Sequence, residues 1–336
     1  MDSPADLVAR VGARARAVVT GDDTPDRCFR MHVGEHVPDG VRRIARGQLI
    51  DGHDELSHAS GRGIGEAVHE TRKRLKRLRG LVRLSRDAIG EQTYERENTA
   101  FRMAGRRLSA TRDAQVLLET LDALGERFAD ELPDSVTASL RARLEQERDR
   151  ALQALRADDA DTTAVLGALT DAVARTPAWT FDREGFAALS PGLRRIYGRG
   201  RKRMRAARKD PTPENLHEWR KRVKDLWHAV EIVGEAQPAK LERFAERAHA
   251  LSGVLGDAHD LHVLREYVRT HPQCFESEAG QLALLAVIDR RATALCRKAL
   301  RRGRKLYDRS PKKFARRIER RWTDRAAAER PKPLAG

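Results

Sequence analysis

Residues 68–86, "VHETRKRLKRLRGLVRLSR", contain eight Lys or Arg side chains, one His and a single Glu. If this stretch is an α-helix, positions three and four apart share a face, and one face carries only basic residues. These are His69, Arg72, Lys73, Lys76, Arg79 and Arg83. Guanidinium groups bind phosphate oxygens two at a time, and ammonium groups act as mobile point charges. Because such a row of like charges repels itself, the pattern predicts an extended polyanion as the partner.

A second face of the same stretch is suited to a protein core. It carries Thr71, Leu75, Leu78 and Val82 at helical spacing, which predicts a narrow stripe packed against other helices. A basic face opposite a core is also typical of a solvated surface, so this stretch alone does not decide between solvent and a bound anion.

The sequence repeats itself, and the repeat favours the anion. "VHETRKRLKRLR" at 68–79 and "LHEWRKRVKDLW" at 216–227 are identical at seven of twelve positions, "GVRRI" at 40–44 resembles "GLRRI" at 192–196, and "LSATRDAQVL" at 108–117 resembles "LGDAHDLHVL" at 255–264. The second copy again has a basic face, formed by His217, Arg220, Lys221 and Lys224. A solvated surface has no need of the same residues at matching positions in two diverged copies.

Apolar residues recur every three or four positions from residue 40 onward, which predicts an all-α protein. We expect helices at about 40–58, 65–88, 92–127, 134–156, 162–175, 186–208, 213–234, 238–270, 276–307 and 312–326. Thr212 and Pro213 predict the cap and first turn of the helix that carries the second basic face. The repeat then predicts two tandem four-helix bundles related by a pseudo-twofold axis, one at about 38–157 and one at about 185–325. Residues 1–37 form an appendage and 326–336 a loose tail.

Charge is distributed unequally between the two copies. Residues 68–86 have a balance of +7 and residues 216–234 a balance of +1. In the second copy the helix before the motif, "RRIYGRGRKRMRAARK" at 194–209, adds nine bases without an acid, so both halves are positive but on different helices. Because the first motif helix itself carries more positive charge, we expect the first copy to bind more strongly. Further candidate phosphate contacts are Arg43, Arg106, Arg112, Arg195, Arg199 and Lys202.

The whole composition agrees with an anionic partner. The chain has 66 Lys and Arg against 50 Asp and Glu, a formal charge of +16, which attracts nucleic acid, polyphosphate or anionic lipid. Aromatic residues make up only 5%, which favours bare phosphate over unpaired bases. Three dispersed cysteines, the lack of an apolar leader and the lack of a membrane-spanning run predict a soluble cytoplasmic protein without a membrane partner.

These motifs resemble the CHAD domain family, whose second helix in each half carries His, then Arg after two residues, then Lys or Arg after three more. His69, Arg72 and Lys76 match this pattern, as do His217, Arg220 and Lys224, and the similarity covers roughly residues 38–325. Asp225 and Trp227 stand where the family has basic residues, and His259 replaces Arg. The resemblance implies two four-helix bundles around a basic central groove, inorganic polyphosphate as the ligand, and association with polyphosphate granules and their proteins.

Catalysis is the less favoured interpretation. "AHD" at 258–260, with His217 and His249, suggests a metal phosphohydrolase, but Arg112 occupies the aligned position in the first copy and Arg cannot ligate a metal. Asp113 and Asp260 fit a role in orienting a neighbour or capping a turn. No CYTH triphosphatase motif precedes the repeats. We expect no enzyme activity, catalytic residue, metal or cofactor. The alternatives are a protein that binds RNA or DNA through "RGRKRMRAARK" and "PKKFARRIERR", or a metal-dependent polyphosphate phosphohydrolase.

Overall fold

The computed structural model describes residues 27–59, 63–108, 113–157 and 160–329. Within these ranges the chain forms eleven α-helices and four short 3-10 helices, and no strand. The predicted all-α class is confirmed. Most of the predicted appendage, the end of the predicted tail and Arg112 lie outside the described residues.

The described part of the first half contains six α-helices. They are α2 (Val37–Ser57), α3 (Ile64–Ile89), α4 (Glu91–Arg107), α5 (Asp113–Arg127), α6 (Asp134–Ala157) and α7 (Ala160–Arg175). The single helix predicted at 92–127 is wrong, because α4 ends at Arg107 and α5 begins at Asp113. The intervening "LSATRD" contains Ser, Thr and Asp, which favour turns and helix caps over helix interiors.

The second half contains five helices. They are α8 (Ser190–Lys209), α9 (Pro213–Ile232), α10 (Pro238–Thr270), α11 (Glu278–Leu306) and α12 (Pro311–Glu329). The Thr212 side chain accepts a hydrogen bond from the Asn215 amide, and Pro213 is the first residue of α9. This is the cap that the sequence predicts. The segment that matches the break between α4 and α5 continues here within one 33-residue helix, α10.

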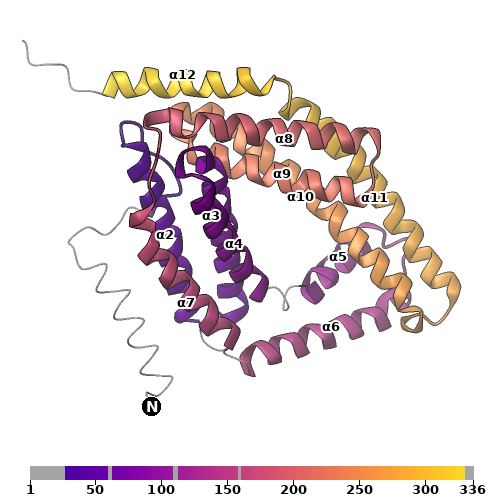
Figure 1. Cartoon of the computed structure of the whole chain (residues 1–336). Helices are drawn as coiled ribbons and strands as arrows, with labels where there is room; N and C mark the ends of the chain where they lie inside the picture. The colour runs from indigo at the N-terminus through magenta and orange to yellow at the C-terminus, as the bar shows by residue number, and fades with distance from the viewer. Residues whose placement is uncertain (1–26, 60–62, 109–112, 158–159, 330–336) are drawn as a thin grey trace, which may run out of the picture.

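Two groups of helices pack side by side (Figure 1). In the first, α3 packs between α2 and α4, and α7 packs on α2 and α4. In the second, α9 packs between α8 and α10, α11 packs on α10, and α12 lies along α8. The first bundle thus includes α7, beyond the predicted limit near residue 157. The hydrophilic "ADDADTT" resembles a domain boundary in sequence, but its last four residues begin α7, the helix that completes the bundle.

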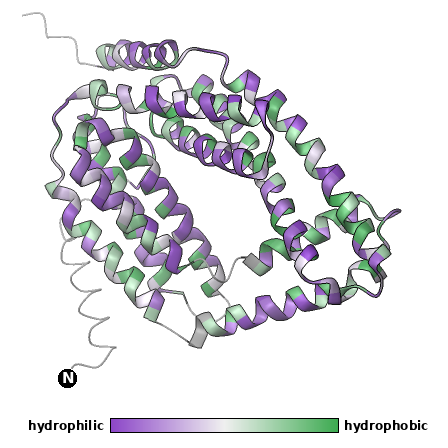
Figure 2. Ribbon diagram, turned by 45° about the vertical axis from the view of Figure 1, so that its right-hand side comes forward, coloured by the Kyte–Doolittle hydropathy of each residue, from purple (hydrophilic) through white to green (hydrophobic). Residues whose placement is uncertain are grey.

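The helices α5 and α6 leave the first bundle. They pack on each other, and they reach the ends of α10 and α11 that lie far from the first bundle (Figure 1). The chain therefore follows a ring-like path, with the first bundle on one side and α10 and α11 on the other. Figure 2 shows hydrophobic and hydrophilic positions mixed on the helices, as expected for amphipathic bundle helices.

One hydrophobic core runs through both halves. The predicted stripe of α3 is buried, with Thr71, Leu75, Leu78 and Val82 each at most 1% exposed. The halves meet closely where α3 crosses α8 and α9. A Cβ atom at Gly192 would lie 1.8 Å from the carbonyl oxygen of Leu84, and one at Gly80 would lie 3.0 Å from His228. These glycines allow two helices of the second half to approach the backbone of α3.

None of the described helices is both long enough and apolar enough to span a bilayer.

Candidate functional site

An open cavity of about 830 Å³ lies between the two halves. Residues of α3, α4 and α5 line it from the first half, and residues of α9 and α10 from the second. Among the described residues, ten Lys or Arg side chains contribute to its wall, against the three acids Glu218, Asp225 and Asp260. The basic residues are Arg72, Lys76, Arg79, Arg83, Arg102, Arg106, Arg220, Lys221, Arg222 and Lys224. These residues give the cavity wall an excess of seven positive charges.

The helical spacing of α3 sets its contribution. Arg72, Lys76, Arg79 and Arg83 follow one another at intervals of three or four residues, so they project from one side while Leu78 and Val82 enter the core. The Arg72 guanidinium donates a hydrogen bond to the carbonyl oxygen of Leu108, directly after α4. This contact ties the start of the basic row to the neighbouring helix.

Two arginines of α3 share one amide. Arg79 Nε and Arg83 Nη2 both donate to Oδ1 of Asn98, at 3.2 and 3.3 Å. Burial, and then the positive charge of Arg83, lowers the pKa of the Arg79 guanidinium to about 10. Arg79 remains charged at neutral pH. Because its surroundings disfavour that charge, a nearby anion would stabilise it.

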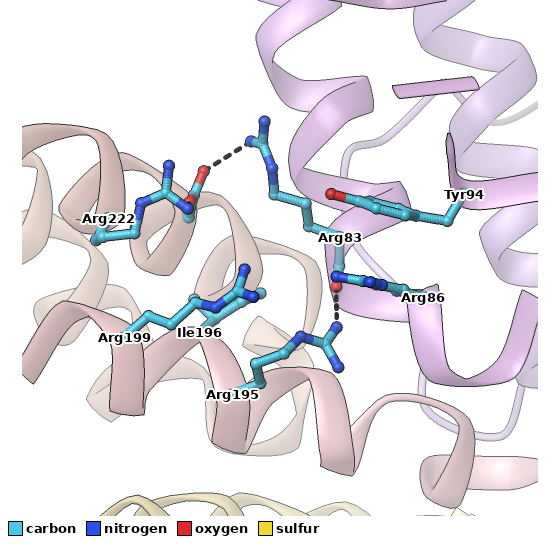
Figure 3. Close-up of a pocket in the computed structure, with 8 residues that line it drawn as sticks. Arg83, Arg86, Tyr94, Arg195, Ile196, Arg199 and Arg222 are labelled. Atoms are coloured by element: carbon cyan, nitrogen blue, oxygen red, sulfur yellow. Dashed lines mark hydrogen bonds and ion pairs between the residues drawn. The ribbon is translucent and has the colours of Figure 1, made fainter. Parts of the chain in front are cut away.

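A carboxylate joins the two halves at one end of the cavity. Arg83 Nη1 lies 2.8 Å from Asp225 Oδ1, and Arg222 Nη1 lies 3.1 Å from Asp225 Oδ2. Asp225 is only 7% exposed. Figure 3 shows Arg83 and Arg222 approaching from different helices, with Arg195 and Arg199 of α8 close by.

The arginines of α8 lie behind this carboxylate rather than in the main cavity. Arg195 forms an ion pair with Asp87, and its Nη2 donates to the carbonyl oxygen of Arg83 at 2.7 Å. Burial, followed by the charges of Arg195 and Arg222, lowers the pKa of Arg199. Arg83, Arg222 and Asp225 line both the main cavity and this small space, so they form the wall between the two.

Two histidines touch within the cavity wall. The ring centroids of His217 and His259 are 4.2 Å apart. Burial, followed by the charges of His217 and Arg220, lowers the pKa of His259 to about 4. Burial, followed by the charges of Lys221 and Arg220, also lowers the pKa of His217. Both rings are therefore neutral near pH 7 in this basic environment.

The structure brings together nine of the sixteen predicted site residues. Those that line the cavity are Arg72, Lys76, Arg79, Arg83, Arg106, His217, Arg220, Lys221 and Lys224. His69, Lys73, Arg43, Arg195, Arg199 and Lys202 do not line it, and Arg112 lies outside the described residues.

Of the predicted residues that do not line the cavity, the next three are Lys73, Arg43 and Lys202. Lys73 lies 2.7 Å from Glu70 of its own turn, and Lys221 makes the same contact with Glu218 in the second copy. Arg43 lies 2.7 Å from Glu35 and donates to the carbonyl oxygen of Arg30, so it anchors the segment before α2. Lys202 is exposed on α8.

Arg102, Arg222 and His259 also line the cavity but are missing from the predicted site. Arg102 lies one helical turn before Arg106, a spacing that could have identified it. Arg222 matches Arg74 in the repeat, but Arg74 contacts Asp51 and Glu55 inside the first bundle. The repeat alone could therefore not assign Arg222 to the cavity.

Across the described part of the chain, no group of three or more His, Cys, Asp or Glu residues is arranged to hold a metal ion.

Comparison with known proteins identifies the fold. No curated protein matches the chain. The structure is similar to the crystal structure of the CHAD domain from the plant Ricinus communis, with a TM-score of 0.56 and 20% sequence identity, over 81% of this chain and 94% of that chain. The family model of the CHAD domain matches residues 48–269. The match spans most of α10 and the whole of α3, α4 and α9, the three helices that carry all ten basic residues of the cavity, and the chain belongs to the CHAD domain family.

Proposed function

We propose that this protein binds inorganic polyphosphate in the cavity between its two halves and does not turn it over. The observation that carries the proposal is the set of ten basic side chains, supplied by both halves, against three acids in one cavity. Membership of the CHAD domain family supports a general role related to polyphosphate.

The cavity wall favours bare phosphate over nucleic-acid bases. Proteins that hold unpaired strands stack the bases on aromatic rings, but Phe101 is the one Phe, Tyr or Trp among the described lining residues, and it is 2% exposed. The volume of the cavity, about 830 Å³, is that of a small-ligand pocket. A thin phosphate chain suits such a cavity better than a duplex does.

Binding in this cavity would be electrostatic. The lysines supply mobile charges and the arginines supply pairs of N–H donors, so a flexible chain of phosphates can bind without a fixed register. Each bound phosphate releases counterions. We also propose that the protein works in the cytoplasm and that this binding recruits it to polyphosphate granules, where it meets granule proteins.

The test replaces one lysine on each wall. We expect Lys76→Glu with Lys224→Glu to lower polyphosphate affinity by at least about tenfold, because the phosphates lose two contacts and gain two repulsive charges. The matched control is Lys73→Glu with Lys202→Glu, which changes the net charge equally outside the cavity and should leave affinity within about twofold. Titrations at one salt concentration measure both. Equal losses in the two variants would contradict the proposed site.

Nucleic acid is the second candidate ligand, because a separate basic cavity of about 500 Å³ lies on the outside of α10 and α12. Its wall has six basic residues against Glu246 and Asp308. The six are Lys240, Arg243, Arg247, Lys305, Arg309 and Arg317. Competition between polyphosphate and duplex DNA or RNA at matched salt separates the candidates. Preferred binding of nucleic acid, lost on Arg243→Glu with Arg317→Glu, would favour this outer surface.

The absence of turnover is tested separately. We expect the protein to release no phosphate from polyphosphate when Mg²⁺ or Mn²⁺ is added. Release that depends on added metal would instead indicate a phosphohydrolase.

A further inference from the structure

Asp225 occupies an unusual place for an acid. It is 7% exposed, it lines the basic cavity, and its two carboxylate oxygens contact one arginine on each wall, Arg83 at 2.8 Å and Arg222 at 3.1 Å. A phosphate group bound at this point would bridge the same two guanidinium groups with its own oxygens. The carboxylate and a phosphate are therefore alternative partners of Arg83 and Arg222.

The two copies of the repeat differ at this position. Asp225 corresponds to Arg77 in the first copy, and the Arg77 guanidinium lies 5.1 Å from the ring of Phe29. The charge reversal thus occurs in the second copy, where the side chain meets Arg83 across the junction of α3 and α9. Its single negative charge is shared by two of the ten cations that line the cavity and offsets one unit of their charge.

Asp225 also lies between two arginine clusters. On one side is the main cavity, with Arg79 and Lys224, and on the other side is the small space lined by Arg195 and Arg199 (Figure 3). The triad of Arg83, Asp225 and Arg222 separates them. A phosphate chain in the cavity meets this carboxylate before it could reach the arginines of α8.

We propose that Asp225 is a built-in counter-anion that occupies one phosphate subsite, holds Arg83 and Arg222, and sets the inner end of the polyphosphate groove. The inference rests on the proposed function. It predicts that the second half contributes less to binding than its number of bases suggests, and it makes Asp225 the residue that limits affinity.

The first experiment removes the negative charge with little change of shape. Asp225→Asn should bind polyphosphate about tenfold more tightly than the unchanged protein, because two charged donors are released to phosphate. A plot of log affinity against log salt should become steeper by about 1 to 2. The gain should vanish when Arg222→Gln is added, an outcome that a merely structural Asp225 would not produce.

The matched control is Asp87→Asn. Asp87 forms an ion pair with Arg195, one helical turn from Arg83, and does not line either cavity. Its replacement adds the same unit of positive charge, and we expect less than about a twofold change in affinity. If Asp225→Asn binds no more tightly than Asp87→Asn, the inference is wrong. If the unchanged protein does not bind polyphosphate at all, the proposed function itself is wrong.

A second measurement keeps Asp225 in place, because removing its carboxylate leaves Arg83 and Arg222 close together without the negative charge between them. In the otherwise unchanged protein, Arg83 is held by Asp225, whereas Arg102 is an exposed side chain on the wall of the same cavity. Arg83→Gln should therefore weaken polyphosphate binding less than Arg102→Gln does. An equal or larger loss for Arg83→Gln would show that the carboxylate does not compete with phosphate and would overturn the proposal.

Discussion

Lys73 and Lys76 lie less than one helical turn apart on α3, yet only Lys76 lines the cavity. Lys73 instead contacts Glu70, and the matching Lys221 contacts Glu218 in the same way. The preserved pairs show that part of the repeated motif neutralises its own charge. Lys221 nevertheless lines the cavity and Lys73 does not, so at the scale of single residues the packing around a base is a better guide to the cavity wall than its identity or its place in the motif.

The histidine pair predicts that the proposed polyphosphate binding depends on pH. The pKa values of His217 and His259 are lowered, to about 4 for His259, so both rings are neutral near pH 7. An anion in the cavity raises these pKa values, and binding then takes up protons. Besides each other, the groups whose charges shift the pKa values of the two rings are Glu218, Arg220, Lys221, Lys224 and His262. Polyphosphate should bind several-fold more tightly near pH 5.5 than near pH 7.5.

The same shifts affect stability without ligand. Because the folded pKa values lie below the unfolded value, the unfolded chain binds protons first, and these two histidines reduce stability as the pH falls from about 6.5 toward 4. Titrations and thermal melts at both pH values measure the two effects. His217→Gln with His259→Gln should flatten both profiles, and His58→Gln, on the exposed end of α2, should change neither. Unchanged profiles in the double variant would contradict this role.

At the scale of elements, α3 is the helix that both halves share. It packs on α2 and α4 of its own bundle and on α8 and α9 of the other. Its core face and its basic face therefore both contact protein or cavity, and its position decides how the arginines of one wall face those of the other.

The α3–α8 contact can be tested at one glycine. A Cβ atom at Gly192 would lie 1.8 Å from the backbone oxygen of Leu84, so Gly192→Ala must separate two helices. We expect it to lower the free energy of unfolding by about 1–3 kcal/mol or more, measured by urea denaturation. Gly198→Ala is the control on the same helix, because its nearest contact is Pro311 at 3.4 Å. It should be neutral or slightly stabilising. Equal stability of the two variants would show that α8 and α3 are not this close.

At the scale of the whole molecule, charge is gathered rather than spread. The chain has a formal charge of +16, and an excess of seven charges lies around one cavity that neither half forms alone. Binding at this site should weaken steeply with salt. If a bound polyanion neutralises all seven excess charges, the plot of log affinity against log salt should have a slope of about −5, the value for a single strand, between about 50 and 200 mM salt.

Filter binding or calorimetry over this range measures the slope. Lys76→Glu with Lys224→Glu should reduce its magnitude, whereas Lys73→Glu with Lys202→Glu should leave it almost unchanged. A slope shallower than about −2 would mean that few phosphates are neutralised, and that the two walls do not act together.

The local spacing of residues in the sequence predicts much of the helical structure of this protein. The buried stripe of Leu75, Leu78 and Val82, the row from Arg72 to Arg83, and the cap at Thr212 could all be predicted, because helix periodicity and capping depend on residues within a few positions. The internal repeat likewise predicted a second basic helix, and with it His217, Arg220 and Lys224. The pseudo-twofold relation between the halves stays a prediction.

Only the tertiary structure decided which of these groups meet. The contacts between Arg83 and Asp225, and between His217 and His259, join positions 142 and 42 residues apart. They depend on where α3 crosses α9 and on how α10 packs beside it, which no short-range pattern encodes. The return of α7 to the first bundle was hidden for the same reason, whereas the break between α4 and α5 has a local signal in the Ser, Thr and Asp of "LSATRD". Helical propensity is local, whereas the cavity is formed by packing between distant segments.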